Sequence, residues 1–412
     1  MTRISVSEPV LRWALERTRQ GASLEQKFPK LPEWLSGKSQ PTLRQLEVLA
    51  KATSTPLGYF FLPEPPEERL PIPHFRTLGN GHPRKPSPDL LETVQMMERR
   101  QSWMREYLLE QGHEPLEFVR SAQLTVEPER LAHEMRQALG LTEGWAADQP
   151  RWTDALRQLR NNVEEAGILV VVNGVVGNNT HRKLDPTEFR GFVLVDEFAP
   201  LVFVNGADGK AAQMFTLAHE LAHIWFGSSA AFDLQELQPA DDETERACNR
   251  VAAEFLVPAS QLREFWPSVR QEPKHFQAIA RHFKVSELVA ARRATDLGLI
   301  TKSEFLDFYR AYQKQERRVA VQGQEGGNFY ATQKLRIGRR FSEVVICSAR
   351  EGRLLYRDAY QLTGLYGRTF ERYAQSHRDI KVRIPIPNAC RASGVEYIDT
   401  FQMMRELGVR LG

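Results

Sequence analysis

The sequence predicts an α+β protein that begins with a separate helical module. Residues 1–60 carry helix start signals: Ser7 precedes an acidic residue and a proline, and Thr42 and Gln45 have the spacing of a capping box. From residue 127 onwards, apolar runs of strand length alternate with helical patterns. We expect helices near residues 128–139 and 152–166, and strands at residues 168–172, 192–195 and 201–205.

The last predicted strand leads into residues 215–223, which contain the pattern H-E-x-x-H in an apolar run. His219 and His223 are four residues apart, so on a helix both imidazoles lie on one face and can bind one metal ion. Glu220 lies near the same face and can serve as a general base. The apolar flanks predict a mostly buried helix, in which histidines need partners, and this favours a zinc site over two surface histidines.

A catalytic zinc ion usually has three protein ligands and one open position for water. Residues 241–258 are acidic at first and then small and apolar, as is typical of a helix that packs closely on another. Glu245 and Asn249 lie one helical turn apart, and we expect Glu245 to be the third ligand, with Glu254 as the alternative. The earlier acidic residues are expected to be solvated charges at the helix start: Asp241, Asp242 and Glu243.

Two segments together, residues 213–223 and 245–258, resemble the ImmA/IrrE family of zinc-dependent peptidases. The resemblance covers roughly residues 1–375 and includes residues 71–77, Pro-Ile-Pro-His-Phe-Arg-Thr. It implies a zincin-like fold of the gluzincin type, with Glu245, four residues before Asn249, as a metal ligand. It also implies a role in bacterial or phage regulation, where members cleave a partner repressor or act on the antitoxin side of a toxin–antitoxin pair.

With this resemblance the chain divides into five parts. We expect an XRE-like helical domain (1–60), a proline-rich linker (61–88), a zincin-like metallopeptidase domain (89–270), a helix-turn-helix-like segment (271–318), and a small C-terminal α/β unit with a tail (319–412). Ser87 and Pro88 are expected to begin a long helix that ends near residue 111.

Two segments bear on DNA binding. Residues 34–42 resemble the end of an XRE-type helix-turn-helix, but residues 23–34 are too few for both a positioning and a recognition helix. Residues 276–293 have the pattern of a second helix-turn-helix, which would leave Arg292 and Arg293 available to DNA phosphates. The alternative is a helical pair that packs on the metallopeptidase domain. The tail, residues 384–411, resembles the end of PIN-like nuclease toxins, although one terminal piece cannot hold nuclease chemistry.

Composition excludes several classes of protein. A net charge of +3 is too small to create a positive electrostatic potential over the whole surface that would attract nucleic acid. The three cysteines are far apart in the sequence, so they form neither a disulfide framework nor a cysteine-type zinc cluster. The first residues contain no apolar core of a signal peptide, and no apolar run reaches the length of a membrane span. We therefore expect a cytoplasmic protein.

The leading hypothesis is a zinc (Zn²⁺) endopeptidase that cleaves a protein partner such as a repressor. Zinc would lower the pKa of its bound water, and Glu220 would accept the proton. The strand at 201–205 could hold an extended substrate by β-augmentation. The alternative is a DNA-binding regulator or antitoxin with a non-catalytic metal site, although the intact Glu220 favours activity. A third hypothesis is a scaffold that silences a toxin from a neighbouring gene, for example a PIN-like nuclease.

Overall fold

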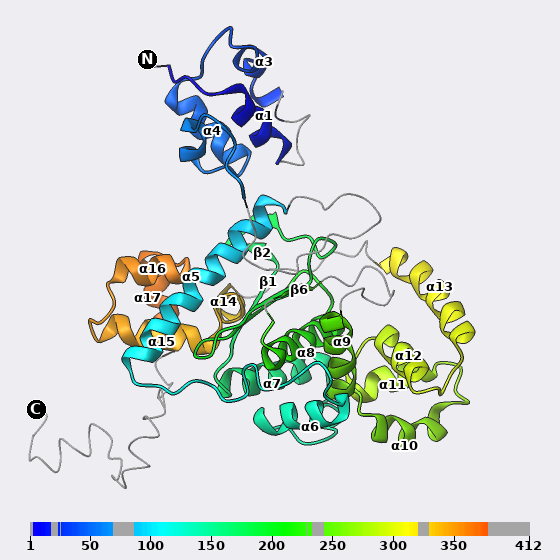
Figure 1. Cartoon of the computed structure of the whole chain (residues 1–412). Helices are drawn as coiled ribbons and strands as arrows, with labels where there is room; N and C mark the ends of the chain where they lie inside the picture. The colour runs from blue at the N-terminus through cyan, green and yellow to red at the C-terminus, as the bar shows by residue number, and fades with distance from the viewer. Residues whose placement is uncertain are drawn as a thin grey trace, which may run out of the picture.

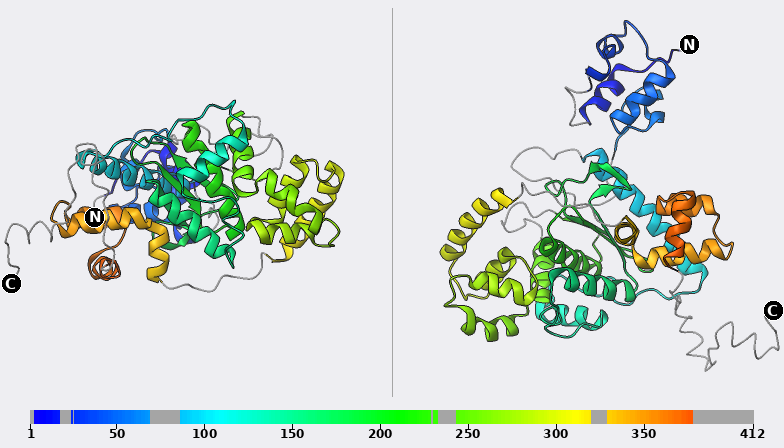
Figure 2. Two further views of the ribbon diagram at one scale, coloured as in Figure 1. Left: turned by 90° about the horizontal axis from the view of Figure 1, so that it is seen from below. Right: turned by 180° about the vertical axis from the view of Figure 1, so that it is seen from behind.

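The computed structural model describes residues 3–17, 24, 26–68, 86–228, 230–232, 243–319 and 329–377. Its N-terminal helices form a group of their own above the body of the molecule, as Figures 1 and 2 show. Several predictions lie outside the described residues: the motif at 71–77 and most of the linker, Asp241 and Asp242, and the tail at 384–411. Among the described residues, no helix is both long and apolar enough to cross a membrane.

The N-terminal module has its own hydrophobic core, which includes Leu11, Trp34, Leu46 and Phe60. Its described helices are α1 (Glu8–Glu16), α3 (Leu31–Leu35), α4 (Leu43–Ala52) and the 3-10 helix η1 (Leu57–Phe61). The predicted capping box is confirmed at the start of α4. The Thr42 side chain accepts a hydrogen bond from the Gln45 N–H (3.4 Å), and Gln45 Oε1 accepts one from the Thr42 N–H (2.9 Å).

The body is built on a four-stranded sheet in the order β1-β5-β4-β6. Its strands are β1 (Leu169–Asn173), β4 (Gly191–Leu194), β5 (Leu201–Asn205) and β6 (Ala230–Phe232), while β2 (Val175–Val176) and β3 (Asn179–Lys183) form a separate hairpin. β5 lies in the middle of the sheet, parallel to β1 and antiparallel to β4. The expectation that the strand at 201–205 could take up an extended peptide is therefore wrong, because both of its edges are already paired.

Helices cover both faces of the sheet, as Figures 1 and 2 show. Alternate residues of a strand point to opposite faces, and here they enter two different cores. Val170, Val202 and Val204 join the core that contains α7 (Trp152–Glu165), α8 (Lys210–Phe226) and α9 (Glu243–Leu256). Leu169, Val171 and Phe203 join the core formed with α5 (Pro88–Glu110) and the C-terminal helices.

The remaining helices of the first core are α6 (Pro128–Ala138), α10 (Ala259–Val269), α11 (His275–Phe283), α12 (Glu287–Asp296) and α13 (Lys302–Val319). The predicted helices near 128–139, 152–166 and 88–111 are thus confirmed. The helix-turn-helix-like pair, α11 and α12, buries Ile279, Phe283 and Ala290 in the same core as α8 and α9. This packing agrees with the alternative of a helical pair on the metallopeptidase domain.

The C-terminal helices are α14 (Phe329–Ile337), α15 (Arg339–Arg350), α16 (Tyr356–Thr363) and α17 (Gly367–Gln375). Residues 329–377 hold no strand, so the strand part of the expected α/β unit is not found in this described portion. Arg100 on α5 ties these helices to the body. Its buried guanidinium donates hydrogen bonds from Nε to Leu362 O and from Nη1 to Arg336 O, both at 2.9 Å.

We predict that Arg100→Ala lowers the free energy of unfolding by about 2–4 kcal/mol, because two carbonyl groups lose their charged donor in a buried position. Urea unfolding followed by circular dichroism measures the change. Arg99→Ala is the matched control, since Arg99 is the exposed neighbour on the same helix, and its effect is expected within about 0.5 kcal/mol. Equal unfolding midpoints for the two variants would contradict this role of Arg100.

Candidate metal centre

The candidate site lies on α8, a helix that is buried along most of its length, as the sequence predicts. The helix ends at Gly227, which adopts a left-handed conformation with φ 76°. In this geometry the Ser228 N–H donates to His223 O at 3.0 Å and satisfies a carbonyl of the last turn. The side chains of His219, Glu220 and His223 all have no exposed surface.

The structure brings the three predicted ligands together. The Nε2 atoms of His219 and His223 lie 3.0 Å apart. Glu245 faces both of them, with its carboxylate oxygens 3.2 Å from His219 Nε2 and 3.3 Å from His223 Nε2. In a tetrahedral site with zinc–nitrogen bonds of about 2.0–2.1 Å, ligand atoms lie roughly 3.3 Å from one another. Two imidazole nitrogens and one carboxylate at this separation fit a divalent cation such as zinc.

Asn249 orients the first histidine. Its Oδ1 lies 3.1 Å from His219 Nδ1, and because an amide oxygen only accepts, Nδ1 must carry the proton. The lone pair of His219 is then on Nε2, the atom that faces Glu245. Sequence reasoning placed Asn249 one turn after Glu245 on the same face of α9 but gave it no role. That spacing was the available signal for its position.

The pKa values of Glu220 and Glu245 are shifted in opposite directions. Burial raises the pKa of Glu220 well above its usual value, and the negative charge of Glu245 raises it further. Burial acts in the same direction on Glu245, but the neighbouring imidazoles of His219 and His223 outweigh it, so the pKa of Glu245 is lowered. Both oxygens of Glu220 are buried and have no hydrogen-bond partner among the described residues. A buried carboxylate in this position is costly unless a cation or a proton donor is close.

Strand β4 approaches the site so closely that it requires a glycine. A Cβ added at Gly191 would lie 2.6 Å from Thr216 Cγ2, 2.8 Å from Phe203 O and 3.2 Å from Glu220 Oε1. The backbone of β4 therefore packs directly on the face of α8 that carries Glu220. Sequence reasoning missed Gly191, because nothing in its neighbourhood along the chain shows which helix crosses it.

Glu254, the alternative third ligand, stabilises the packing of the helices instead. Its carboxylate accepts a hydrogen bond from the Ala259 N–H at 3.1 Å and forms a buried ion pair with Arg293. Among the described residues, the group that can hold a metal ion consists of His219, His223 and Glu245.

The same contact corrects the prediction that Arg293 binds DNA. Arg293 is buried, and its Nε donates to Val257 O at 3.0 Å, so the guanidinium does not face solvent. Arg292 is more exposed and forms an ion pair with Asp296 at 3.1 Å. The helix-turn-helix-like segment therefore loses one of its two predicted phosphate contacts.

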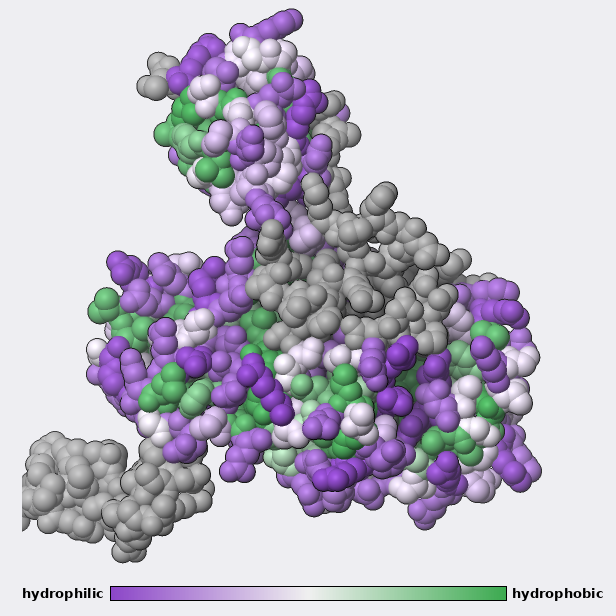
Figure 3. All heavy atoms as spheres, viewed as in Figure 1, coloured by the Kyte–Doolittle hydropathy of each residue, from purple (hydrophilic) through white to green (hydrophobic). Residues whose placement is uncertain are grey.

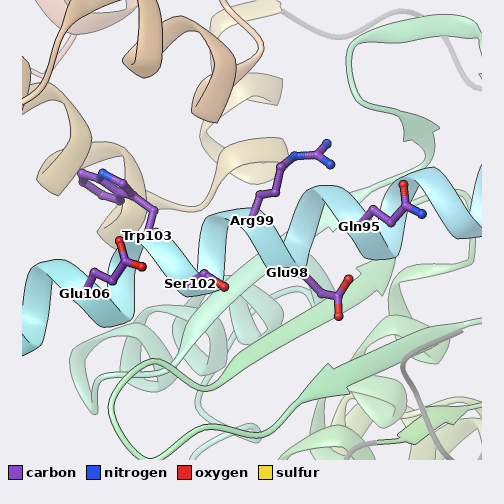
Figure 4. A pocket seen from close by; sticks show the side chains of 6 residues that line it. All are labelled: Gln95, Glu98, Arg99, Ser102, Trp103 and Glu106. Carbon is purple, nitrogen blue, oxygen red and sulfur yellow. The ribbon is translucent and has the colours of Figure 1, made fainter. Parts of the chain in front are cut away.

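A surface depression of about 560 Å³ lies away from the metal centre, along α5. Figure 4 shows that all of its lining side chains come from this one helix: Gln95, Glu98, Arg99, Ser102, Trp103 and Glu106. None of the predicted ligands lines it, so this depression is separate from the candidate centre.

Comparison with known proteins identifies the segment that contains the candidate centre. Residues 163–295 match a peptidase family model described as the IrrE N-terminal-like domain. The match includes α8 and α9 with all three predicted ligands. It supports the resemblance to the ImmA/IrrE family and suggests a protease-related function of the metallopeptidase type.

Two further matches cover the C-terminal region. Residues 337–376 match a domain of unknown function (DUF8813), and residues 369–411 match another (DUF4411). The search of curated proteins found no match.

We predict that Gly191→Ala destabilises the protein by roughly 1–3 kcal/mol, because the new methyl group meets backbone and helix atoms that cannot move aside. Gly58→Ala is the control, since a Cβ at Gly58 meets nothing within 4 Å. Thermal unfolding of both variants measures the difference. If Gly191→Ala unfolds at the same temperature as Gly58→Ala, then β4 does not pack on α8 as described.

We predict that Asn249→Ala weakens metal binding by about 10–100-fold, because His219 loses the acceptor that holds its ring and its tautomer. Competition with a chromogenic zinc chelator measures the affinity. Arg250→Ala, an exposed neighbour on α9, should bind zinc like the wild type. Unchanged affinity in Asn249→Ala would show that His219 does not depend on this hydrogen bond.

Proposed function

We propose that the chain is a zinc-dependent endopeptidase. His219, His223 and Glu245 hold the zinc ion, and Glu220 is the general base. The observation that carries this proposal is the convergence of two buried histidines and a carboxylate within 4.8 Å of one another, with Glu220 beside them. A purely structural metal site has no need for a second buried carboxylate without hydrogen bonds.

Different residues of the chain have different roles in the proposed hydrolysis. A bound zinc ion supplies a Lewis acid that lowers the pKa of water. Glu220 accepts the proton of the attacking water and passes it to the leaving amine. Burial suits Glu220 to this exchange, because a carboxylate with a raised pKa holds a proton more readily than an exposed one. Asn249 keeps His219 in the tautomer that presents Nε2.

An extended peptide is the substrate form that the sheet supports best. β6 is the last strand of the four-stranded sheet and pairs with β4, the strand that packs on α8. A peptide that adds to the other edge of β6 would form main-chain hydrogen bonds there. This replaces the expected role of the strand at 201–205. The proposed substrate is a repressor-like protein partner in a bacterial or phage regulatory or toxin–antitoxin system.

A second candidate function is a regulator or antitoxin that binds a partner through the N-terminal module, with a non-catalytic metal site. The module carries exposed apolar side chains, visible as green areas in Figure 3. The exposed large apolar residues of the module include Leu43 (45% exposed), Val48 (40%) and Phe61 (54%). Such side chains on a small helical module suit contact with another protein.

We predict that the purified wild type contains about one zinc ion per chain and that His223→Ala and Glu245→Ala lose it. Elemental analysis after gel filtration measures the metal. His181→Ala is the control, because His181 is an exposed histidine on β3 and should leave the zinc content unchanged. A wild type that stays free of zinc when zinc is supplied would remove the hydrolytic mechanism.

We further predict that Glu220→Gln keeps its zinc and loses cleavage of a regulator encoded beside the chain, because the amide cannot accept the proton. Co-expression of both proteins followed by mass spectrometry of the partner measures cleavage. Retained cleavage in Glu220→Gln would refute Glu220 as the base. Zinc in the wild type without cleavage of any neighbouring regulator or toxin would favour the second candidate function.

A further inference from the structure

A cleft of about 850 Å³ separates the N-terminal module from the body. None of the three candidate metal ligands lines it. The module lines it with residues of α4 and η1 and with the end of α1. The body lines it with the start of α5 and with β3. The polar side chains that matter for binding include Arg17, Lys51, Tyr59, Gln95, Asn179 and Arg182. Figure 1 shows the module above the start of α5 and the β2–β3 hairpin.

Arg17 lies in this cleft with part of its hydrogen-bonding capacity unused. Its side chain is only 10% exposed, and its Nη2 lies 2.8 Å from Glu68 Oε1. The guanidinium carbon lies 4.5 Å from the centre of the Trp13 ring, which is a cation–π contact. The Nε and Nη1 atoms are buried and have no hydrogen-bond partner among the described residues. Buried donors without an acceptor cost free energy, and the described part of the chain provides none for these two atoms of Arg17.

The charges around Arg17 point to the same kind of acceptor. Burial lowers the pKa of Arg17, and the positive charge of Arg182 also lowers it. The nearby Glu68 and Tyr59 act in the opposite direction and raise it. Arg17 of the N-terminal module and Arg182 of the body thus both line the same cleft. Arg182 is held by Asp89 at 2.6 Å and by Glu92 at 2.5 Å. Of the carboxylates that line the cleft, Glu68 and Glu92 are thus already engaged, and Glu47 is the third.

We propose that this cleft binds a ligand through an oxyanion, either a carboxylate or a phosphate, that accepts hydrogen bonds from Nε and Nη1 of Arg17. Charge-assisted hydrogen bonds to a guanidinium are among the stronger polar contacts in proteins. The cleft is larger than a single oxyanion, so the rest of the ligand contacts neutral polar groups such as Tyr59, Asn179 and Gln95. Because these groups come from both units, a bound ligand holds the N-terminal module against the body. The proposal does not depend on the function of the metal centre.

Isothermal titration calorimetry of the full chain tests the proposal with two probes, inorganic phosphate and succinate, at an ionic strength kept constant with chloride. We expect saturable binding of at least one probe. Binding of phosphate alone identifies a phosphate ligand, and binding of succinate alone identifies a carboxylate ligand. Saturable binding of neither probe overturns the proposal.

The matched variants are Arg17→Gln and Arg12→Gln. Both change an arginine of α1, but the Arg12 side chain is 61% exposed and pairs with Glu8 at 2.7 Å. We expect Arg17→Gln to weaken binding on the order of tenfold or more and Arg12→Gln to leave it unchanged. Equal affinity in the wild type and Arg17→Gln overturns the proposal. If circular dichroism shows that Arg17→Gln does not fold, Arg17→Lys replaces it, and wild-type affinity in that variant overturns the proposal equally.

Discussion

The packing of α8 against α9 is the contact on which the candidate centre depends. The two histidines belong to one helix, but their carboxylate and the amide that orients His219 belong to the other. Both helices contribute fully buried alanines to the same core, including Ala218, Ala222 and Ala252, and such small side chains allow helices to approach closely. Arg136 holds the end of α9 by donating to Glu254 O and Phe255 O at 3.1 and 3.2 Å. Residues far from the histidines thus help to hold the helix that carries Glu245 in place.

The sheet divides the body into two cores that support each other. One core contains the helices of the candidate centre, and the other contains α5 and the C-terminal helices. Phe192 of β4 faces the second core, while the neighbouring Gly191 lies against Thr216 and Glu220. β4, the strand that limits the space around Glu220, therefore packs with its opposite face on helices of the C-terminal region. This gives residues 337–376 a structural connection to the candidate centre, although they lie outside the match to the peptidase family.

Local patterns could predict the parts of this structure that arise within one helix turn or one strand. The capping box at Thr42 and the pairs His219–His223 and Glu245–Asn249 each depend on spacing along a single helix, which the sequence shows directly. The order of the strands depends on pairing between distant segments, and so the central position of β5 was not predictable. The burial of Arg293 has the same origin, because its partner Glu254 lies 39 residues earlier in the chain. Gly191 is required by a strand and a helix that both follow it in the chain.

The two edges of the four-stranded sheet are not equivalent. A Cβ at Gly338 would lie 2.8 Å from Val170 O, so the start of α15 presses on the outer strand β1 and leaves no room for another strand. Exposed sheet edges are the places where proteins join into fibrils, and natural folds commonly block them. In this sheet the blocked edge at β1 rules out growth by strand addition on that side. A substitution at Gly338 that displaced the C-terminal helices would therefore carry a second penalty, because it would open a new surface for self-association.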